Sequence, residues 1–405
     1  MLAQHSARPA GAASSARRLG WLRWLALTPL ALLASVLAFL TAAIMLGAYV
    51  PAIPKIGMIG PVLGGQYPFH MAFLALIGVA LSALAWRGGL VRWGRTVAAI
   101  TALSAVAALV VCGVQFAAAR RAGTSVSLGE VFSQLAYPGV TPDTTRTYAV
   151  RDGESLKADV YLPGGQRAGK APAVVLAHAG GFHTFDKSDL RGTGRWLADH
   201  GVAVFAVDYR LATPERPTWD KAPQDLLSAL RWVQDHADGF GLDPARISLG
   251  GMSAGGTLAL DTAYRLKNGA IRAADGRTPE PPASVVGFYP GTDVTEMWRA
   301  NMDGSRDAAE WFTGGTPQQY PQRYRETSPV AQVRAGLPPT LLVVGDRDRS
   351  VRPPTVRAFG DALRRHGVDT RIEELPFADH AFDDAYGSLT SQTSRQILLG
   401  FLTAH

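Results

Sequence analysis

The pattern that most constrains the fold is the pentapeptide Gly-Met-Ser-Ala-Gly at residues 251–255, because a predicted strand leads into it and a predicted helix leaves it. Residues 246–250 form a short apolar alternation, and residues 256–264 show a helical apolar pattern. A Gly-x-Ser-x-Gly turn at such a junction is typical of a nucleophile elbow, which holds its serine in a strained, exposed conformation. Glycines suit the places where the strand and helix backbones nearly touch. The pentapeptide therefore makes Ser253 a candidate nucleophile.

Three further sequence elements lie before and after this turn, and their order along the chain is informative. An apolar run followed by His-Ala-Gly-Gly-Phe occupies residues 173–182, ahead of the pentapeptide. An apolar run followed by Gly-Asp-Arg-Asp occupies residues 340–348, and an alternating strand followed by Asp-His-Ala-Phe occupies residues 370–382. Glycine-rich loop, serine, aspartate and histidine, each at a strand end, follow the chain order of an α/β-hydrolase triad. Four ordered elements are much harder to obtain by chance than one.

Residues from about 145 to 405 resemble an α/β-hydrolase of the esterase/lipase group that includes hormone-sensitive-lipase-like and BD-FAE-type carboxylesterases. The turns above carry the resemblance, together with Val-Asp-Tyr-Arg-Leu-Ala at 207–212 and Gly-Leu-Asp-Pro-Ala-Arg-Ile at 241–247. The resemblance implies the α/β-hydrolase fold, in which a doubly wound, mostly parallel sheet carries a serine nucleophile. It does not specify a substrate.

The resemblance also implies an oxyanion hole, the set of N–H groups that stabilises a negatively charged reaction intermediate. The family's His-Gly-Gly-Gly reads His-Ala-Gly-Gly in this chain. The two glycines that supply N–H groups in the family match Gly180 and Gly181, so the replacement at Ala179 leaves both donors in place. The third N–H would come from Ala254, directly after the candidate nucleophile. His178 is expected to brace this loop.

The remaining triad members follow from what a serine nucleophile needs. A serine hydroxyl stays protonated at neutral pH, so a base must take its proton during attack. His380 is the best candidate, because its pKa is near neutral and it follows the last predicted strand. Asp348 would orient the imidazole, and Asp346, two residues earlier, is the alternative; the family pattern favours Asp348.

The charge distribution divides the chain in two. The first 129 residues contain ten Lys or Arg and no Asp or Glu, whereas the rest contains 30 basic and 33 acidic residues. The net charge of +7 is therefore a property of the N-terminal third. The basic residues there punctuate apolar runs and form no patch, which argues against nucleic acid as a partner.

Three uncharged runs follow a basic N-terminal tail at residues 1–23, at about 24–49, 67–86 and 96–119. Each is long enough to cross a hydrocarbon core of about 30 Å, so the sequence predicts a three-helix transmembrane region. Trp and Tyr residues lie near the predicted ends, as interfacial aromatics do. The alternatives are a cleaved signal peptide for the first run and buried soluble helices for the other two.

The arginines predict an orientation in the membrane. Seven arginines precede the first run or lie between the second and third, against three Lys or Arg in the other loop and after the third run. By the positive-inside rule, the N-terminus is cytoplasmic and the catalytic domain extracytoplasmic. The single cysteine, Cys112, lies within the third run, so the catalytic domain can form no disulfide.

Residues 120–144 are rich in Gly, Ser, Thr and Pro and are expected to form a linker to a catalytic domain at 145–405. That domain should open with a hairpin and continue as alternating strands and helices, which predicts helices on both faces of the sheet. An aromatic-rich insertion at 291–338 either caps the active site or is a surface excursion. Parallel strands are expected near residues 173–177, 202–208, 246–250, 284–289, 340–344 and 370–375.

These features together predict a membrane-anchored serine hydrolase that cleaves carboxylic esters, with a lipid or other apolar acyl ester as substrate and the lipid bilayer as its surroundings. No cofactor and no metal are expected, because Asp383 and Asp384 beside His380 fit a solvated turn better than a ligand cluster. The alternatives are a serine peptidase or amidase on the same fold and a non-catalytic binding module. An intact set of Ser253, Asp348 and His380 argues against the binding module.

Overall fold

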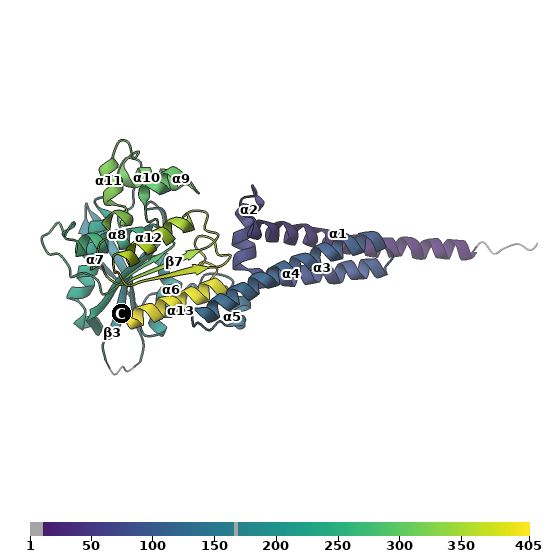
Figure 1. Cartoon of the computed structure of the whole chain (residues 1–405). Coiled ribbons are helices and arrows are strands. Elements are labelled where there is room, and N and C mark those ends of the chain that lie inside the picture. Colours follow the sequence, from purple (N-terminus) through teal and green to yellow (C-terminus); the bar gives the residue numbers. More distant parts are fainter. Residues whose placement is uncertain (1–10, 166–168) are drawn as a thin grey trace, which may run out of the picture. The chain divides into compact units, whose positions relative to one another are not determined.

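The computed structural model describes residues 11–165 and 169–405, and its chain divides into two compact units, Met1–Gly113 and Val114–His405 (Figure 1). Residues 1–10 of the predicted basic tail lie outside the described residues. Each unit is described by itself below.

The first unit is helical. Three of its described helices are long and apolar enough to cross a membrane, over Trp24–Tyr49, Pro68–Arg87 and Val91–Arg121. The sequence predicts the first two within a residue, whereas the third begins five residues before its predicted start and includes Arg92 and Arg95. The elements are α1 (Gly11–Tyr49), α2 (Ile56–Ile59), the π-helix η1 (Gly60–Gly65), α3 (Pro68–Arg87) and α4 (Val91–Arg121), whose last eight residues belong to the second unit.

Small residues set the packing between these helices. A Cβ atom on Gly78 of α3 would lie only 2.7 Å from Thr101 of α4, so the two helices approach closely there. Tyr49 at the end of α1 donates a hydrogen bond to the carbonyl of Ala107 at 2.9 Å. Large apolar side chains on the outer faces, such as Phe39 and Leu103, are exposed. Small residues at helix contacts with apolar residues outward are typical of membrane-embedded helices.

The second unit is built on an eight-stranded sheet with the order β1-β2-β4-β3-β5-β6-β7-β8. The first two strands form an antiparallel hairpin that adds antiparallel to β4, and the remaining neighbours are parallel. Both faces are covered, which explains why β3, β4, β6, β7 and the second half of β5 are almost wholly buried and mostly apolar. The strands are β1 (Thr144–Arg151), β2 (Glu154–Tyr161), β3 (Ala171–Ala177), β4 (Ala203–Val207), β5 (Leu242–Met252), β6 (Val285–Phe288), β7 (Thr340–Gly345) and β8 (Thr370–Leu375).

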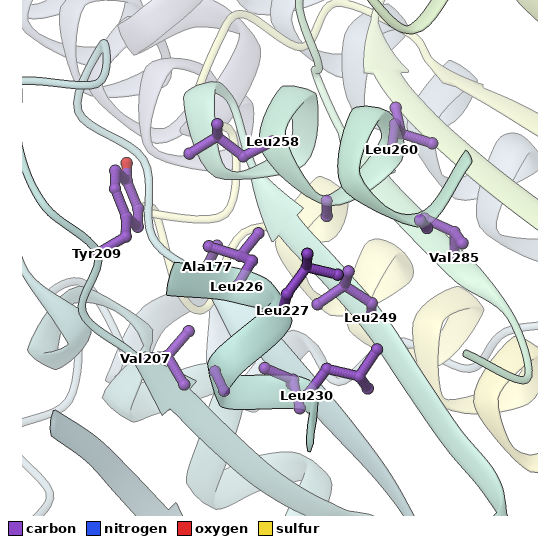
Figure 2. Packing of buried hydrophobic residues seen from close by; sticks show 14 of the residues in the cluster. Ala177, Val207, Tyr209, Leu226, Leu227, Leu230, Leu249, Leu258, Leu260 and Val285 are labelled. Carbon is purple, nitrogen blue, oxygen red and sulfur yellow. The ribbon is translucent and has the colours of Figure 1, made fainter. Parts of the chain in front are cut away.

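Helices form a layer on each face of this sheet (Figure 1). On one face α7, α8 and α12 pack into a core in which Leu226, Leu227 and Leu230 of α7 meet Leu249 of β5 (Figure 2). On the other face α6 and α13 pack against β3, β4 and β7. This architecture confirms the predicted α/β-hydrolase fold. The helices are α6 (Arg191–Asp199), α7 (Ala222–Asp235), α8 (Ala254–Lys267), α12 (Pro353–Arg365) and α13 (Leu389–Ala404), with short 3-10 turns η2 (Lys187–Leu190) and η3 (Asp238–Phe240).

The expected linker and the aromatic-rich insertion both contain short helices. Residues 120–144 include the short helix α5 (Leu128–Ser133), whose first turn is capped by Ser127. The insertion at 291–338 contains α9 (Val294–Ala300), α10 (Ser305–Thr313), α11 (Pro321–Glu326) and the 3-10 turn η4 (Pro329–Gln332). Of its aromatic residues, Phe312 and Tyr324 are buried, whereas Trp311 lines the cavity described below.

Candidate active site

Ser253 lies at the turn between β5 and α8, with φ of 51°, in the left-handed region that residues with side chains seldom adopt. The flanking glycines allow this turn to form. A Cβ on Gly251 would lie 2.3 Å from the carbonyl carbon of Gly255, and a Cβ on Gly255 would lie 2.2 Å from the carbonyl oxygen of Ala177. No other residue type fits at either place, so the pentapeptide forces Ser253 out of the turn toward the cavity.

The structure brings the three predicted triad residues together at the carboxyl ends of β5, β7 and β8. Nε2 of His380 lies 2.9 Å from Oγ of Ser253, and Nδ1 of His380 lies 2.9 Å from Oδ2 of Asp348. The other carboxylate oxygen of Asp348 accepts hydrogen bonds from the backbone N–H groups of Ser350 and Val351 at 2.9 and 2.7 Å. A proton on Nδ1 therefore leaves Nε2 free to accept the proton of Ser253.

Asp346, the alternative third member, makes different contacts. Its Oδ1 accepts a hydrogen bond from the backbone N–H of Phe377 at 2.6 Å, and burial raises the pKa of its carboxyl group. The carboxylate that contacts His380 is that of Asp348. Asp346 thus connects the loop after β7 to the loop after β8.

A second connection between these loops comes from Arg349 and Asp379. The guanidinium Nε of Arg349 donates to Oδ2 of Asp379 at 2.9 Å, and the backbone N–H of Arg349 donates to Oδ1 at 3.2 Å. Asp379 is buried. Because Arg349 follows Asp348 and Asp379 precedes His380, this ion pair fixes the spacing of the two triad residues.

The predicted oxyanion residues lie in the loop after β3 and at the start of α8. Gly180 and Gly181 have φ of 111° and 57°, and both line the cavity beside Ser253. In the described part of the chain, no acceptor is paired with the N–H of Gly180, Gly181 or Ala254. Ala254 is the first residue of α8, where the helix N-terminus favours negative charge. These three N–H groups therefore remain the candidate donors of an oxyanion hole.

The His178 side chain supports the loop that carries Gly180 and Gly181. It is buried, its ring stacks on Tyr209 at 4.3 Å between centroids, and its Nδ1 lies 2.6 Å from the carbonyl oxygen of Ala179. The hydroxyl of Tyr209 donates to the carbonyl of His178 at 3.0 Å. Burial lowers the pKa of His178, so the ring is neutral and structural at pH 7.

Acidic groups surround the candidate base. Burial lowers the pKa of His380, but the carboxylates of Asp348, Asp379 and Asp383 outweigh burial and raise the pKa above its usual value. Asp383 is buried and accepts a hydrogen bond from the hydroxyl of Tyr289 at 2.6 Å. The expectation that Asp383 belongs to a solvated turn is therefore wrong. The Tyr289 ring packs on His380 with centroids 4.6 Å apart.

A cavity of about 660 Å³ opens over Ser253 and His380. Apolar side chains from η2 and from the 291–338 insertion line much of it, among them Leu190, Met297, Met302 and Trp311. Its polar lining includes the carboxylates of Asp189, Asp303, Asp307, Asp383 and Asp384, and the guanidinium of Arg191. Pockets of this size hold small organic ligands.

Sequence reasoning missed two groups of residues around this site. Tyr289 and Asp383 contact or face His380. The sequence signal for Tyr289 is its position directly after β6, and that for Asp383 is its place three residues after His380. Tyr137 lines the cavity from the predicted linker, for which the sequence carries no signal at all.

Comparison with known proteins finds esterases among the relatives of this chain. Esterase LipC of Mycobacterium tuberculosis is 30% identical over 220 residues, which cover 52% of this chain and 52% of LipC. The chain thus spans about half the length of this curated relative. Ethyl acetate hydrolase of Pseudomonas putida is 29% identical over 248 residues, covering 57% of this chain and 73% of the hydrolase.

Solved structures of Thermogutta terrifontis esterase 2 match the fold. The form phosphonylated by sarin is 25% identical with a TM-score of 0.55, covering 67% of this chain and 98% of the esterase. The butyrate-bound form is also 25% identical, with a TM-score of 0.54 and coverage of 67% and 97%. The BD-FAE family model matches residues 158–363, about half of the chain. This chain therefore belongs to the BD-FAE family of α/β-hydrolases.

Proposed function

We propose that this chain is a membrane-anchored carboxylesterase that hydrolyses esters of apolar acyl groups through an acyl-enzyme on Ser253. The observation that carries the proposal is the unbroken series of contacts from Ser253 through His380 to Asp348 at the base of the cavity. Family membership supports it, as do the names of the relatives, an esterase and an ethyl acetate hydrolase.

In the first step, Oγ of Ser253 attacks the ester carbonyl carbon while Nε2 of His380 takes the hydroxyl proton. Asp348 stabilises the imidazolium that forms. The negative charge moves to the carbonyl oxygen, which then accepts hydrogen bonds from the N–H groups of Gly180, Gly181 and Ala254. One such donor is typically worth about 2.7–4 kcal/mol of barrier.

The tetrahedral intermediate then collapses. The bond from the carbonyl carbon to the alcohol oxygen breaks, and His380 gives its proton to the departing alcohol, which leaves an ester on Ser253. A water molecule attacks this acyl-enzyme while His380 takes a water proton. His380 returns that proton to Oγ of Ser253, so the acid is released and the enzyme is restored.

The cavity supports a preference for uncharged, apolar acyl groups. Its apolar side chains can hold an alkyl chain, whereas its carboxylates repel an anion. The butyrate bound to esterase 2 is consistent with a short acyl chain in such a site. Three apolar helices ahead of the catalytic unit support esters that dissolve in, or lie next to, a membrane.

We further propose that the three helices span the membrane with the catalytic unit outside the cytoplasm, as the seven-to-three distribution of basic residues indicates. Fusions to His405 test this orientation. An alkaline phosphatase fusion should be active and a green fluorescent protein fusion dark. A bright fluorescent fusion with silent phosphatase would reverse the orientation.

Activity is tested with the detergent-solubilised full chain and its Ser253→Ala variant. The wild type should hydrolyse p-nitrophenyl butyrate, and the variant should lose at least about 10³-fold in kcat. p-Nitrobutyranilide, the matched amide, should be hydrolysed far more slowly. Faster cleavage of the anilide would favour the amidase, and no turnover of either by folded protein would favour the binding module.

A further inference from the structure

The segment at residues 125–138, which follows the third long helix, is fastened to the catalytic unit rather than extended between domains. We call it the strap. Two glutamines of α13, one helical turn apart, hold its backbone in the manner of a neighbouring strand (Figure 1 shows α5 of the strap beside α13). Gln392 accepts from the N–H of Ser127 at 2.6 Å and donates to its carbonyl at 3.0 Å. Gln396 makes the same pair of contacts with Ser125.

The middle of the strap is held by backbone contact at Gly387. Its N–H donates to the carbonyl of Gln134 at 2.9 Å. A Cβ at Gly387 would lie 2.2 Å from the carbonyl oxygen of Glu130, so a side chain there would force the strap away. The strap is therefore held by close packing at Gly387 as well as by hydrogen bonds.

Tyr137, near the end of the strap, is held by contacts to its hydroxyl and to its ring. Its hydroxyl accepts a hydrogen bond from the N–H of Thr193 at 3.2 Å, and its ring meets Tyr386 edge to face at 5.4 Å. The guanidinium of Arg191 lies 5.1 Å from the ring centroid, and its Nε donates to the carbonyl of Pro138 at 2.9 Å. A side chain fixed by this many contacts keeps its shape when a ligand binds.

Tyr137 packs closely against Gly192 and also lines a second hollow beside the strap. A Cβ on Gly192 would lie 2.9 Å from atoms of Tyr137, Pro138 and Tyr386 alike. A ligand that reaches the ring from the cavity over Ser253 therefore meets an aromatic surface that these contacts hold in place. Tyr137 lines the same cavity as Ser253 and His380, together with Leu190 and Arg191.

We infer that Tyr137 is a specificity-determining residue that limits the size of the ester accepted in the cavity. This inference rests on the proposed function, since it concerns the substrate of the same site. The strap begins four residues after α4 ends at Arg121. The stretch of chain that would tether the enzyme to its membrane is thereby also a wall of its substrate site.

The test uses the full chain in detergent with two ester series. One varies the acyl group from acetate to decanoate as p-nitrophenyl esters, and the other varies the alcohol of butyrate esters. Tyr137→Ala should raise kcat/KM for the largest member of a series relative to the smallest by at least about tenfold, mainly through KM, since one methylene in an apolar pocket is worth about 10–200-fold. Tyr137→Trp should lower the same ratio.

Two further variants and a control distinguish an effect of the size of the Tyr137 side chain from an effect on folding. Tyr137→Phe keeps the ring and loses only the contacts of the hydroxyl with the N–H and Oγ1 of Thr193, so it should keep the wild-type profile within about twofold. Gln392→Ala combined with Gln396→Ala should loosen the strap, increase its cleavage by protease and move the profile in the direction of Tyr137→Ala. Tyr320→Ala, a half-exposed tyrosine outside the cavity, is the matched control and should change nothing.

Labelling of Ser253 by a fluorophosphonate probe distinguishes a failure of the specificity role of Tyr137 from a failure of the proposed function. If Tyr137→Ala and Tyr137→Trp are labelled like the wild type yet leave both ester profiles unchanged, the specificity role of Tyr137 is refuted while the proposed function stands. If the folded wild type is not labelled, the proposed function fails first. A changed profile with normal labelling supports both.

Discussion

Arg349 and Asp379 form an ion pair that joins the two loops carrying the acid and the base of the candidate triad. Arg349 directly follows Asp348, and Asp379 directly precedes His380. The guanidinium and the backbone N–H of Arg349 both donate to the buried carboxylate of Asp379. The pair therefore sets the distance between Asp348 and His380 without touching either side chain's reactive atoms.

Replacing Asp379 with Asn should shift the acid limb of the kcat/KM–pH profile to lower pH. The carboxylate of Asp379 helps raise the pKa of His380, together with Asp348 and Asp383 and against the effect of burial. Without that charge the pKa of His380 falls, so the unprotonated base persists to lower pH. Asp369→Asn, at an exposed carboxylate, is the matched control and should leave the limb in place. A purely structural role for Asp379 would lower kcat without moving the limb.

Asp348→Asn should reduce kcat by about 10⁴-fold, because an amide at this place stabilises the wrong tautomer of the histidine and no longer stabilises the imidazolium. Asp346→Asn should retain activity within about tenfold, since an amide oxygen can still accept the hydrogen bond from Phe377. Steady-state kinetics on p-nitrophenyl butyrate measure both. The reverse order of effects would assign the triad to Asp346.

Gly255→Ala should lower the free energy of unfolding by at least about 3 kcal/mol and abolish ester hydrolysis, because its Cβ would lie 2.2 Å from the carbonyl oxygen of Ala177. Gly400→Ala in α13 is the matched control: no atom lies within 4 Å of its added Cβ. Alanine is the better helix former by roughly 0.8–1.0 kcal/mol, so that variant should be as stable as the wild type or more so. Thermal unfolding measures both, and equal losses would mean that the elbow glycine has no special role.

The carboxylates that line the cavity should discriminate against negatively charged esters. p-Nitrophenyl succinate carries a carboxylate where p-nitrophenyl butyrate has a terminal methyl group. We expect its kcat/KM to be at least about tenfold lower at pH 7.5, with a smaller difference in high salt and in Asp384→Asn. Equal rates for the two esters would show that these charges do not reach the bound acyl chain.

Much of the catalytic core could be predicted because local sequence determines it. The elbow depends on Gly251 and Gly255, which permit a backbone contact that other residues forbid. Asp348 and His380 follow strands whose apolar pattern is clear, and the ends of neighbouring parallel strands meet at one edge. The geometry of such turns is determined by a few residues that are adjacent in the sequence, so it can be predicted from the sequence.

Other features depend on contacts distant in the sequence. The polar composition of residues 120–144 resembles a linker. Contacts from residues far along the chain, among them the glutamines of α13 more than 250 residues later, hold it as a strap. Asp383 looks solvated beside Asp384, yet the hydroxyl of Tyr289 satisfies it inside the protein. The third apolar helix starts early because its arginines remain at its end, where the Arg95 guanidinium lies 4.8 Å from the Trp86 ring.

The most direct test of an activated serine is reaction of the full chain with a fluorophosphonate, followed by intact mass measurement and peptide mapping. The account predicts one adduct per chain, located on Ser253, and none in Ser253→Ala or after prior reaction with paraoxon. A folded wild-type protein that gains no adduct, or gains it at another residue, would contradict the assignment of Ser253 as the nucleophile.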